Sequence, residues 1–110
     1  MVNMTSWIVP KEGCVYCHRV REQYLVPLAR EGLAVVQVDW RSNEPLQGLA
    51  GPLTHDQQVR AWKVRMAPTL LFLGPGGREV APRLVGMSST DFYGAYLDAR
   101  LEQARKVVRS

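Results

Sequence analysis

The two cysteines of this chain, Cys14 and Cys17, lie three residues apart in the stretch GCVYCH, which ends at His18. Two thiols at this spacing, followed by a histidine, are compatible with three kinds of chemistry. The pair can exchange electrons as a dithiol and a disulfide, anchor a haem, or supply half of a zinc site. Because two cysteines are too few for a disulfide-rich scaffold, the pair is catalytic, metal-binding, cofactor-anchoring or a single small staple.

A haem anchored at CVYCH would use His18 as one axial ligand and would need a second ligand, for which Met66 and Met87 are the candidates. Cytochromes of this type are predominantly helical. The strand-like runs of this chain and its Gly-Pro-Gly-Gly turn at residues 74–77 leave too little helix to enclose a haem. A c-type haem protein is therefore the less favoured alternative.

A zinc site would combine the cysteine pair and His18 with His55, the second histidine of the chain. This spacing matches no common structural zinc finger. We interpret His55 as a solvated polar residue near the start of a helix. The sequence therefore predicts no metal site.

A redox pair needs one reactive thiol and one partner that closes the disulfide. At the N-terminus of a helix, unpaired N–H groups and the positive end of the helix dipole stabilise a thiolate, and Cys14 is expected at this place. Cys17, one turn further along, is expected to be more covered by the fold. This asymmetry predicts Cys14 as the nucleophile and Cys17 as the resolving thiol.

Two short apolar runs flank a helical pattern in the first part of the chain. Residues 5–9 and 33–39 read as buried strands. Between them a helix closing near Gly32 is indicated by one apolar stripe, made of Cys17, Val20, Tyr24 and Leu28. Pro27 should kink or end this helix because it removes the bond to the Gln23 carbonyl. The resulting β-α-β unit requires parallel strands, and its first strand leads directly to the cysteines.

The second part of the chain predicts a helix, a hairpin and a final helix. Thr54 and Gln57 form a capping box for a helix that carries Val59, Trp62 and Val64 and ends before Met66. The runs PTLLFL and REVAPRLV flank the Gly-Pro-Gly-Gly turn as a hairpin. Ser88 and Asp91 are expected to cap a last helix, whose buried stripe is formed by Leu97, Leu101, Ala104 and Val108.

The order β-α-β, loop and helix, β-β-α predicts an α/β fold, with a mixed sheet of about four strands flanked by helices. We expect a single domain over residues 1–110, with residues 42–53 as a loop insertion. The net charge of +4 comes from scattered arginines without a basic block, so no nucleic-acid partner is predicted. The longest apolar runs are too short for stable membrane insertion. A secretory leader is absent from the sequence, but a leader removed earlier would leave the same chain.

Three stretches of the chain resemble the thioredoxin superfamily in their order and spacing. They are GCVYC after a strand, RMAPTLLFL before a hairpin, and LVGMSSTDFYGAYLDARL as strand end, loop and last helix. The resemblance spans Thr5 to about Gln103, and it is greatest to the small periplasmic thioredoxins of sulfur-oxidation clusters, the SoxS type. It implies a compact thioredoxin-like fold and supports the roles of the two cysteines.

The resemblance also implies a substrate-binding surface around the cysteines. Pro68 matches the cis-proline of the family, which faces the cysteine pair and lets the preceding Ala67 offer its N–H and C=O to an extended substrate. Gly86 resembles the glycine that ends the last strand beside the site. The Met66–Ala67 backbone is then expected opposite Cys14. Four residues are expected to form a small apolar rim around the attacking sulfur: Val15, Tyr16, Ala67 and Met87.

Two departures argue against general thioredoxin activity. Ile8 stands six positions before the first cysteine, where thioredoxins carry a buried acidic residue. The pair between the cysteines is Val15-Tyr16 instead of Gly-Pro.

The predicted function is that of a thiol-disulfide oxidoreductase, which reduces disulfides of partner proteins by dithiol exchange through Cys14 and Cys17 without a bound cofactor. Besides the haem protein, the alternative is a thioredoxin-fold binding module whose disulfide is only structural. The SoxS resemblance implies a periplasmic protein that receives electrons from a membrane electron carrier, with a cytoplasmic location as the alternative. We expect a monomer.

Overall fold

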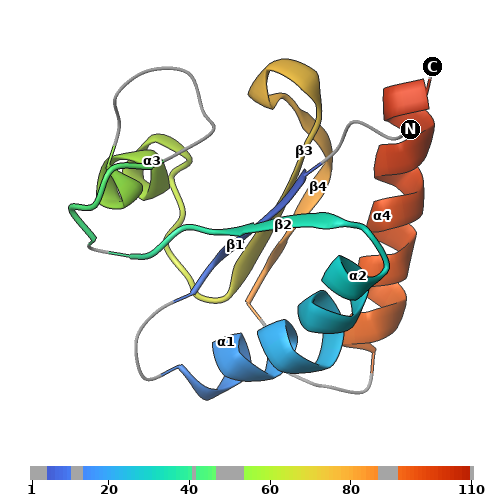
Figure 1. The fold of residues 1–110 in the computed structure, drawn as a ribbon, viewed down its shortest axis with the longest axis horizontal. Coiled ribbons are helices and arrows are strands. Elements are labelled where there is room, and N and C mark those ends of the chain that lie inside the picture. The colour runs from blue at the N-terminus through green and yellow to red at the C-terminus, as the bar shows by residue number, and fades with distance from the viewer. Residues whose placement is uncertain (1–4, 11–13, 41, 47–53, 87–91, 110) are drawn as a thin grey trace.

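The computed structural model describes residues 5–10, 14–40, 42–46, 54–86 and 92–109 of the chain. Four strands form one sheet in the order β2-β1-β3-β4: β1 (Thr5–Val9), β2 (Ala34–Gln37), β3 (Thr69–Leu73) and β4 (Glu79–Val85). Strands β1 and β2 are parallel, while β3 is antiparallel to both β1 and β4 (Figure 1). The predicted mixed sheet of four strands flanked by helices is confirmed.

The first crossover stays helical through three consecutive elements, α1 (Val15–Val20), η1 (Arg21–Leu25) and α2 (Val26–Arg30). η1 is a π-helical turn, and the Val26 N–H reaches back to the Arg21 carbonyl. This wider turn directly precedes Pro27, which has no N–H to donate, so the expected distortion takes the form of a π turn rather than a helix end.

The π turn also changes which side chains of the crossover are buried. Cys17, Val20 and Leu25 are buried, whereas Tyr24 and Leu28 of the predicted stripe are only partly covered. An extra residue in one turn rotates everything after it, so the stripe continues at Leu25 instead of Tyr24.

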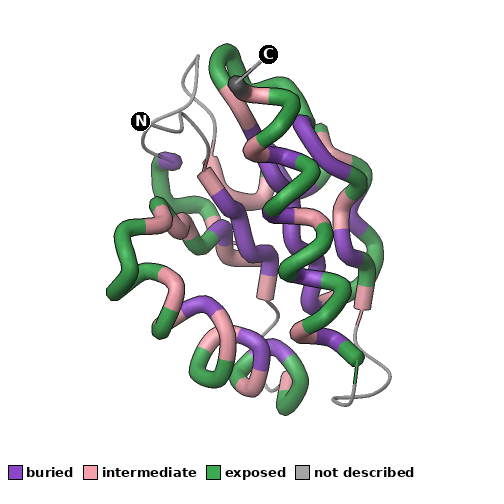
Figure 2. The backbone as a smooth tube through the Cα atoms, turned by 90° about the vertical axis from the view of Figure 1, so that its right-hand side faces the viewer, coloured by how far each residue is buried: buried purple, intermediate pink, exposed green. Residues whose placement is uncertain are grey.

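The sheet has an apolar core on each face. One core joins the sheet to the crossover and to α4 (Tyr93–Arg109), and it contains Ile8, Leu25, Phe72, Leu97 and Leu101 among others. The second core joins the opposite face to α3 (His55–Ala61) through residues such as Trp7, Leu71 and Val59. All five residues of β3 are buried. Figure 2 shows the buried segments in the strands and, at intervals, along α4.

Several element boundaries differ from those predicted. The capping box of Thr54 and Gln57 is present, but α3 ends at Ala61, with Trp62 as its C-cap and Lys63 at φ 58°. Val64 is still buried, but from the turn after the helix. Strand β2 ends at Gln37 and is therefore shorter than the predicted residues 33–39. It lies at the edge of the sheet, so its four residues are exposed or half-buried rather than buried.

The hairpin between β3 and β4 is confirmed, with the short helical turn η2 (Pro75–Gly77) at its tip. Of the stripe predicted for the last helix, Leu97, Leu101 and Ala104 are buried and Val108 is half-buried. The proposed caps Ser88 and Asp91, and residues 47–53 of the predicted loop, lie outside the described residues. In the described part of the chain no helix is long and apolar enough to cross a membrane.

Tyr93, at the start of α4, is buried against the crossover. Its ring centroid lies 5.4 Å from that of Tyr24, and its hydroxyl has no hydrogen-bond partner among the described residues. Burial first, and then the neighbouring Tyr24, raise the pKa of Tyr93 well above its ordinary value. In the folded protein this phenol therefore stays neutral at pH values where an unfolded tyrosine ionises.

We expect the free energy of unfolding to fall as the pH rises above about 10, because only the unfolded state then loses this proton. Tyr93→Phe should remove this contribution and should be at least as stable as the wild type at pH 8, since it deletes an unpaired hydroxyl. Urea unfolding of both proteins at pH 8 and pH 11 tests this. Equal losses of stability with pH in the two proteins would contradict it.

Candidate functional site

The sheet brings one end of three strands together beside the start of α1. At that end Val9 of β1 pairs with Thr69 of β3, and Thr69 pairs with Val85 of β4. The chain leaves β1 there and reaches α1 a few residues later. The predicted site segments are therefore gathered at one end of the sheet, although they lie up to about seventy residues apart in the sequence.

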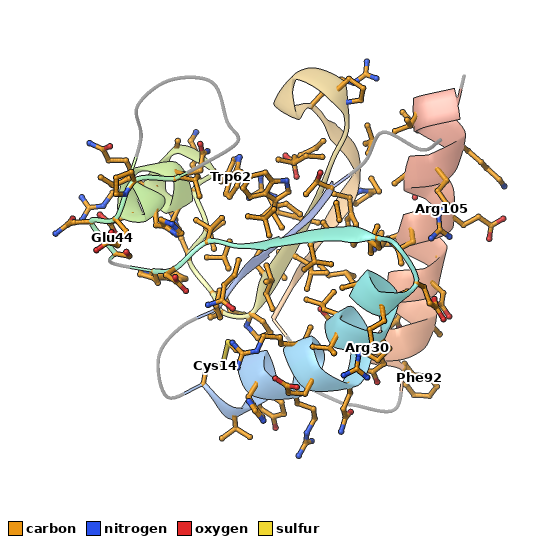
Figure 3. The ribbon with its side chains drawn as sticks, viewed as in Figure 1. Cys14, Arg30, Glu44, Trp62, Phe92 and Arg105 are labelled. Carbon is orange, nitrogen blue, oxygen red and sulfur yellow. A yellow bond between two sulfur atoms is a disulfide. The ribbon has the colours of Figure 1, made fainter. Side chains whose placement is uncertain are left out.

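Cys14 and Cys17 are joined in a disulfide, with their Cα atoms 5.2 Å apart (Figure 3). Cys14 is the N-cap of α1, and its Sγ accepts a hydrogen bond from the Cys17 N–H over 3.1 Å. Cys14 is half-buried, whereas only 3% of Cys17 is exposed. The accessible sulfur thus lies at the helix N-terminus and the covered one lies a turn further in, which is the asymmetry that the sequence predicts.

The side chains between and after the cysteines face outward. Val15 is 68% exposed and Tyr16 is 43% exposed. The guanidinium of Arg19 lies 6.0 Å from the centre of the Tyr16 ring, and His18 is exposed. The first turn of α1 carries no acidic residue. A thiolate formed at this helix start would therefore meet backbone N–H groups without a carboxylate in the same turn.

The residues before β3 and after β4 are bonded to each other. The Ala67–Pro68 peptide bond is cis, and the carbonyl of Pro68 accepts a 2.8 Å hydrogen bond from the Gly86 N–H. The Thr69 hydroxyl donates a hydrogen bond to the Met66 carbonyl, and this bond closes the turn of residues 66–69 that leads into β3. Gly86 has φ 73°, a conformation that favours glycine. Met87, the remaining predicted site residue, lies outside the described residues.

The side chains of Met66 and Val85 are not among the predicted contributors to this surface. They are 55% and 58% exposed, and both lie at the sheet end that carries the disulfide. From the sequence, Met66 is a candidate haem ligand, and the resemblance places its backbone opposite Cys14. In the structure its side chain lies against Gly86. Because Met66 and Gly86 are twenty positions apart, no local sequence pattern indicates this contact. An exposed position for Val85 follows only from the strand register.

His55 is not the solvated residue that the sequence suggests. Only 15% of its side chain is exposed, and its Nδ1 accepts a 2.9 Å hydrogen bond from the Asp39 N–H. This bond connects the start of α3 to the segment after β2. Its role in the structure is therefore to join two segments. Ile8, at the position of the acidic residue of thioredoxins, is buried in the apolar core.

No protein-family model matches the sequence, and no curated protein matches it significantly. Among solved structures, the periplasmic thioredoxin SoxS from Paracoccus pantotrophus, in its reduced form, is 27% identical, with a TM-score of 0.57 over 92% of this chain and 98% of that chain.

Two further structures have similar folds at lower identity. Thioredoxin O2 from Arabidopsis thaliana, in its oxidised state, is 17% identical, with a TM-score of 0.63 over 94% of this chain and 76% of that one. The oxidoreductase DsbH is 20% identical, with a TM-score of 0.61 over 96% of this chain and 74% of that one. At these identities the similarity is one of fold.

Proposed function

We propose that this chain, which has a thioredoxin fold, is a thiol-disulfide oxidoreductase that acts through Cys14 and Cys17. The observation that carries the proposal is the difference between the two sulfurs: Cys14 is accessible at the N-cap of α1, and Cys17 is almost completely covered. The similarity to SoxS supports the same chemistry. A purely structural staple has no need of such a difference.

In the proposed reaction the reduced protein gives two electrons to a partner disulfide. The Cys14 thiolate attacks one partner sulfur, the partner S–S bond breaks, and the leaving thiolate takes up a proton. Cys17 then loses its proton and attacks the Cys14 sulfur, which releases the second partner thiol. The protein is left with the Cys14–Cys17 disulfide, and an external dithiol must reduce it before the next cycle.

The surface around Cys14 is proposed to bind the partner. Val15 and Tyr16 from α1, together with Ala67, Pro68, Gly86 and Met87 from the other two segments, would contact an extended chain on either side of its cysteine. The backbone of Ala67 would pair with this extended chain over a short stretch, by β-type hydrogen bonds. Such a small contact area makes the encounter weak until the covalent bond forms.

The finer assignments follow the similarity to SoxS, whose name describes a periplasmic thioredoxin. We propose that this protein is also periplasmic and works as a monomer in the reducing direction. Because the cysteine pair itself carries the electrons, the reaction needs no bound cofactor. A membrane electron carrier is the proposed source of reducing equivalents.

Equilibration of the purified protein with glutathione redox buffers tests the proposed function. We expect reversible exchange and a reduction potential between about −270 and −120 mV, the range of thioredoxin-like redox proteins. The fraction of oxidised protein is measured by acid quenching, thiol labelling and mass spectrometry. Cys14→Ser, which cannot form the disulfide, is the labelling control.

The alternative, a binding module with a structural disulfide, predicts a different outcome. Structural disulfides have potentials below about −300 mV and resist reduction by glutathione. A protein that stays oxidised throughout the glutathione range would therefore contradict the proposed function and support the binding module.

A further inference from the structure

The side chain of Met66 covers Gly86, the residue that follows β4. A Cβ atom added to Gly86 would stand 2.6 Å from the Met66 sulfur and 3.6 Å from its Cγ. The thioether thus occupies the space that a side chain at position 86 would fill. Since Gly86 also has φ 73°, the absence of a side chain there serves both the backbone turn and the contact with Met66.

The backbone on both sides of this contact is fixed, but the thioether is not enclosed. The Met66 carbonyl accepts a hydrogen bond from the Thr69 hydroxyl, and the Gly86 N–H donates one to the Pro68 carbonyl. Met66 nevertheless remains 55% exposed. A methionine side chain is unbranched, polarizable and rich in rotamers, so it can change shape without moving its backbone. Met66 therefore presents an adaptable apolar surface on a rigid support.

We propose that Met66 is a specificity-determining residue for the dithiol exchange proposed above, on which this inference rests. Its thioether contacts the partner residue next to the reactive cysteine and favours partners in which that residue is apolar. The geometry that points to this role is the position of Met66 between the solvent and Gly86, one residue before the proposed pairing group of Ala67.

The neighbouring side chains support the same preference. Val85 is 58% exposed on the strand that leads into Gly86, and Val15 is 68% exposed at the start of α1. An apolar partner residue would remove hydrocarbon surface from water here, whereas a polar one would lose hydration without a new hydrogen bond from these side chains. Because the Met66 side chain can change its conformation, it can contact apolar partner residues of several different shapes.

The experiment compares three disulfide probes under single turnover with the fully reduced protein. Two are symmetric peptide disulfides that differ only in the residue beside the cysteine, leucine in one and serine in the other, so that charge is constant. The third, bis(2-hydroxyethyl) disulfide, is too small to reach beyond the reacting sulfur. We expect the wild type to reduce the leucine peptide about tenfold faster than the serine peptide.

Met66→Ala should lower this preference to less than about twofold and should leave the small disulfide unaffected, because only the contact beside the cysteine is lost. Phe92→Ala is the matched control: Phe92 is 65% exposed and lies well apart from Cys14 in Figure 3. It should keep the wild-type preference. Met66→Leu, which keeps an apolar side chain of similar size, should restore at least half of that preference on a logarithmic scale.

Each other result overturns the inference in an identifiable way. A wild-type preference that persists in Met66→Ala excludes Met66 as its source. Equal loss of rate on all three probes assigns Met66 a general structural role. If the wild type reduces none of the probes, the proposed function itself is contradicted. This result differs from one in which the wild type reduces all the probes but Met66 does not determine the preference.

Discussion

Replacing Cys14 with serine will lower the rate of disulfide reduction by more than about a thousandfold, because the hydroxyl that takes the place of the thiol cannot form the mixed disulfide. The measurement is the reduction of a peptide disulfide by dithiothreitol in the presence of the protein, after subtraction of the uncatalysed rate. Thermal unfolding of the variant is the control that it remains folded. Activity that survives within tenfold of the wild type would contradict the role of Cys14 as nucleophile.

Replacing Cys17 with serine should have a different consequence. The accessible Cys14 can still attack a partner, but nothing then resolves the mixed disulfide, so a covalent complex should accumulate through Cys14. Non-reducing electrophoresis and mass spectrometry identify it. Cys14→Ser leaves only the covered Cys17, which is 3% exposed, and should trap little partner. Equal trapping by the two variants would show that the assigned roles are wrong.

The features that sequence predicted well are those determined by neighbouring residues or by periodicity. Thr54 and Gln57 lie three residues apart, and their reciprocal capping depends on nothing outside that turn. The apolar run of β3 identifies a strand buried on both faces. The cysteine pair at a strand-to-helix connection follows from the β-α-β order, and so does the difference in exposure between its two thiols.

The features that sequence reasoning missed depend on residues far apart in the chain or on a single inserted residue. The π turn before Pro27 shifts burial from Tyr24 to Leu25, because one extra residue rotates the rest of the crossover. Because α3 ends at Ala61, the direction of the Trp62 side chain is no longer determined by helical periodicity. Its ring packs edge-on against Trp7, with 5.7 Å between the ring centres. Apolar periodicity alone does not distinguish a helix end from the turn that follows it.

The same limit applies to the candidate site. The segment around Pro68 could be placed near the cysteines only through a family resemblance, whereas the structure brings it there through the pairing of Val9 with Thr69. The contact of Met66 with Gly86 depends on this register and on the turn before β3. It therefore adds a residue to the site that neither composition nor spacing can indicate.

The two phenylalanines of the chain provide a matched test of the core. Phe72 of β3 is completely buried, pairs with Ser6 and Ala81 on its two neighbouring strands, and contributes to the core beneath α4. Phe92 is 65% exposed. Replacement by alanine thus removes the same ring from a buried position at residue 72 and from an exposed position at residue 92.

Phe72→Ala should lower the free energy of unfolding by about 3–5 kcal/mol, because it loses the burial of the ring and leaves a cavity in the centre of the sheet. Phe92→Ala should change it by less than about 0.5 kcal/mol. Urea unfolding, with the disulfide kept oxidised in every sample, measures both. Phe72→Leu, which refills part of the cavity, should lose less than half as much as Phe72→Ala and gives a value even if the alanine variant does not fold. Similar losses at positions 72 and 92 would contradict the placement of Phe72 in the core, and with it the sheet register that brings the three segments of the site together.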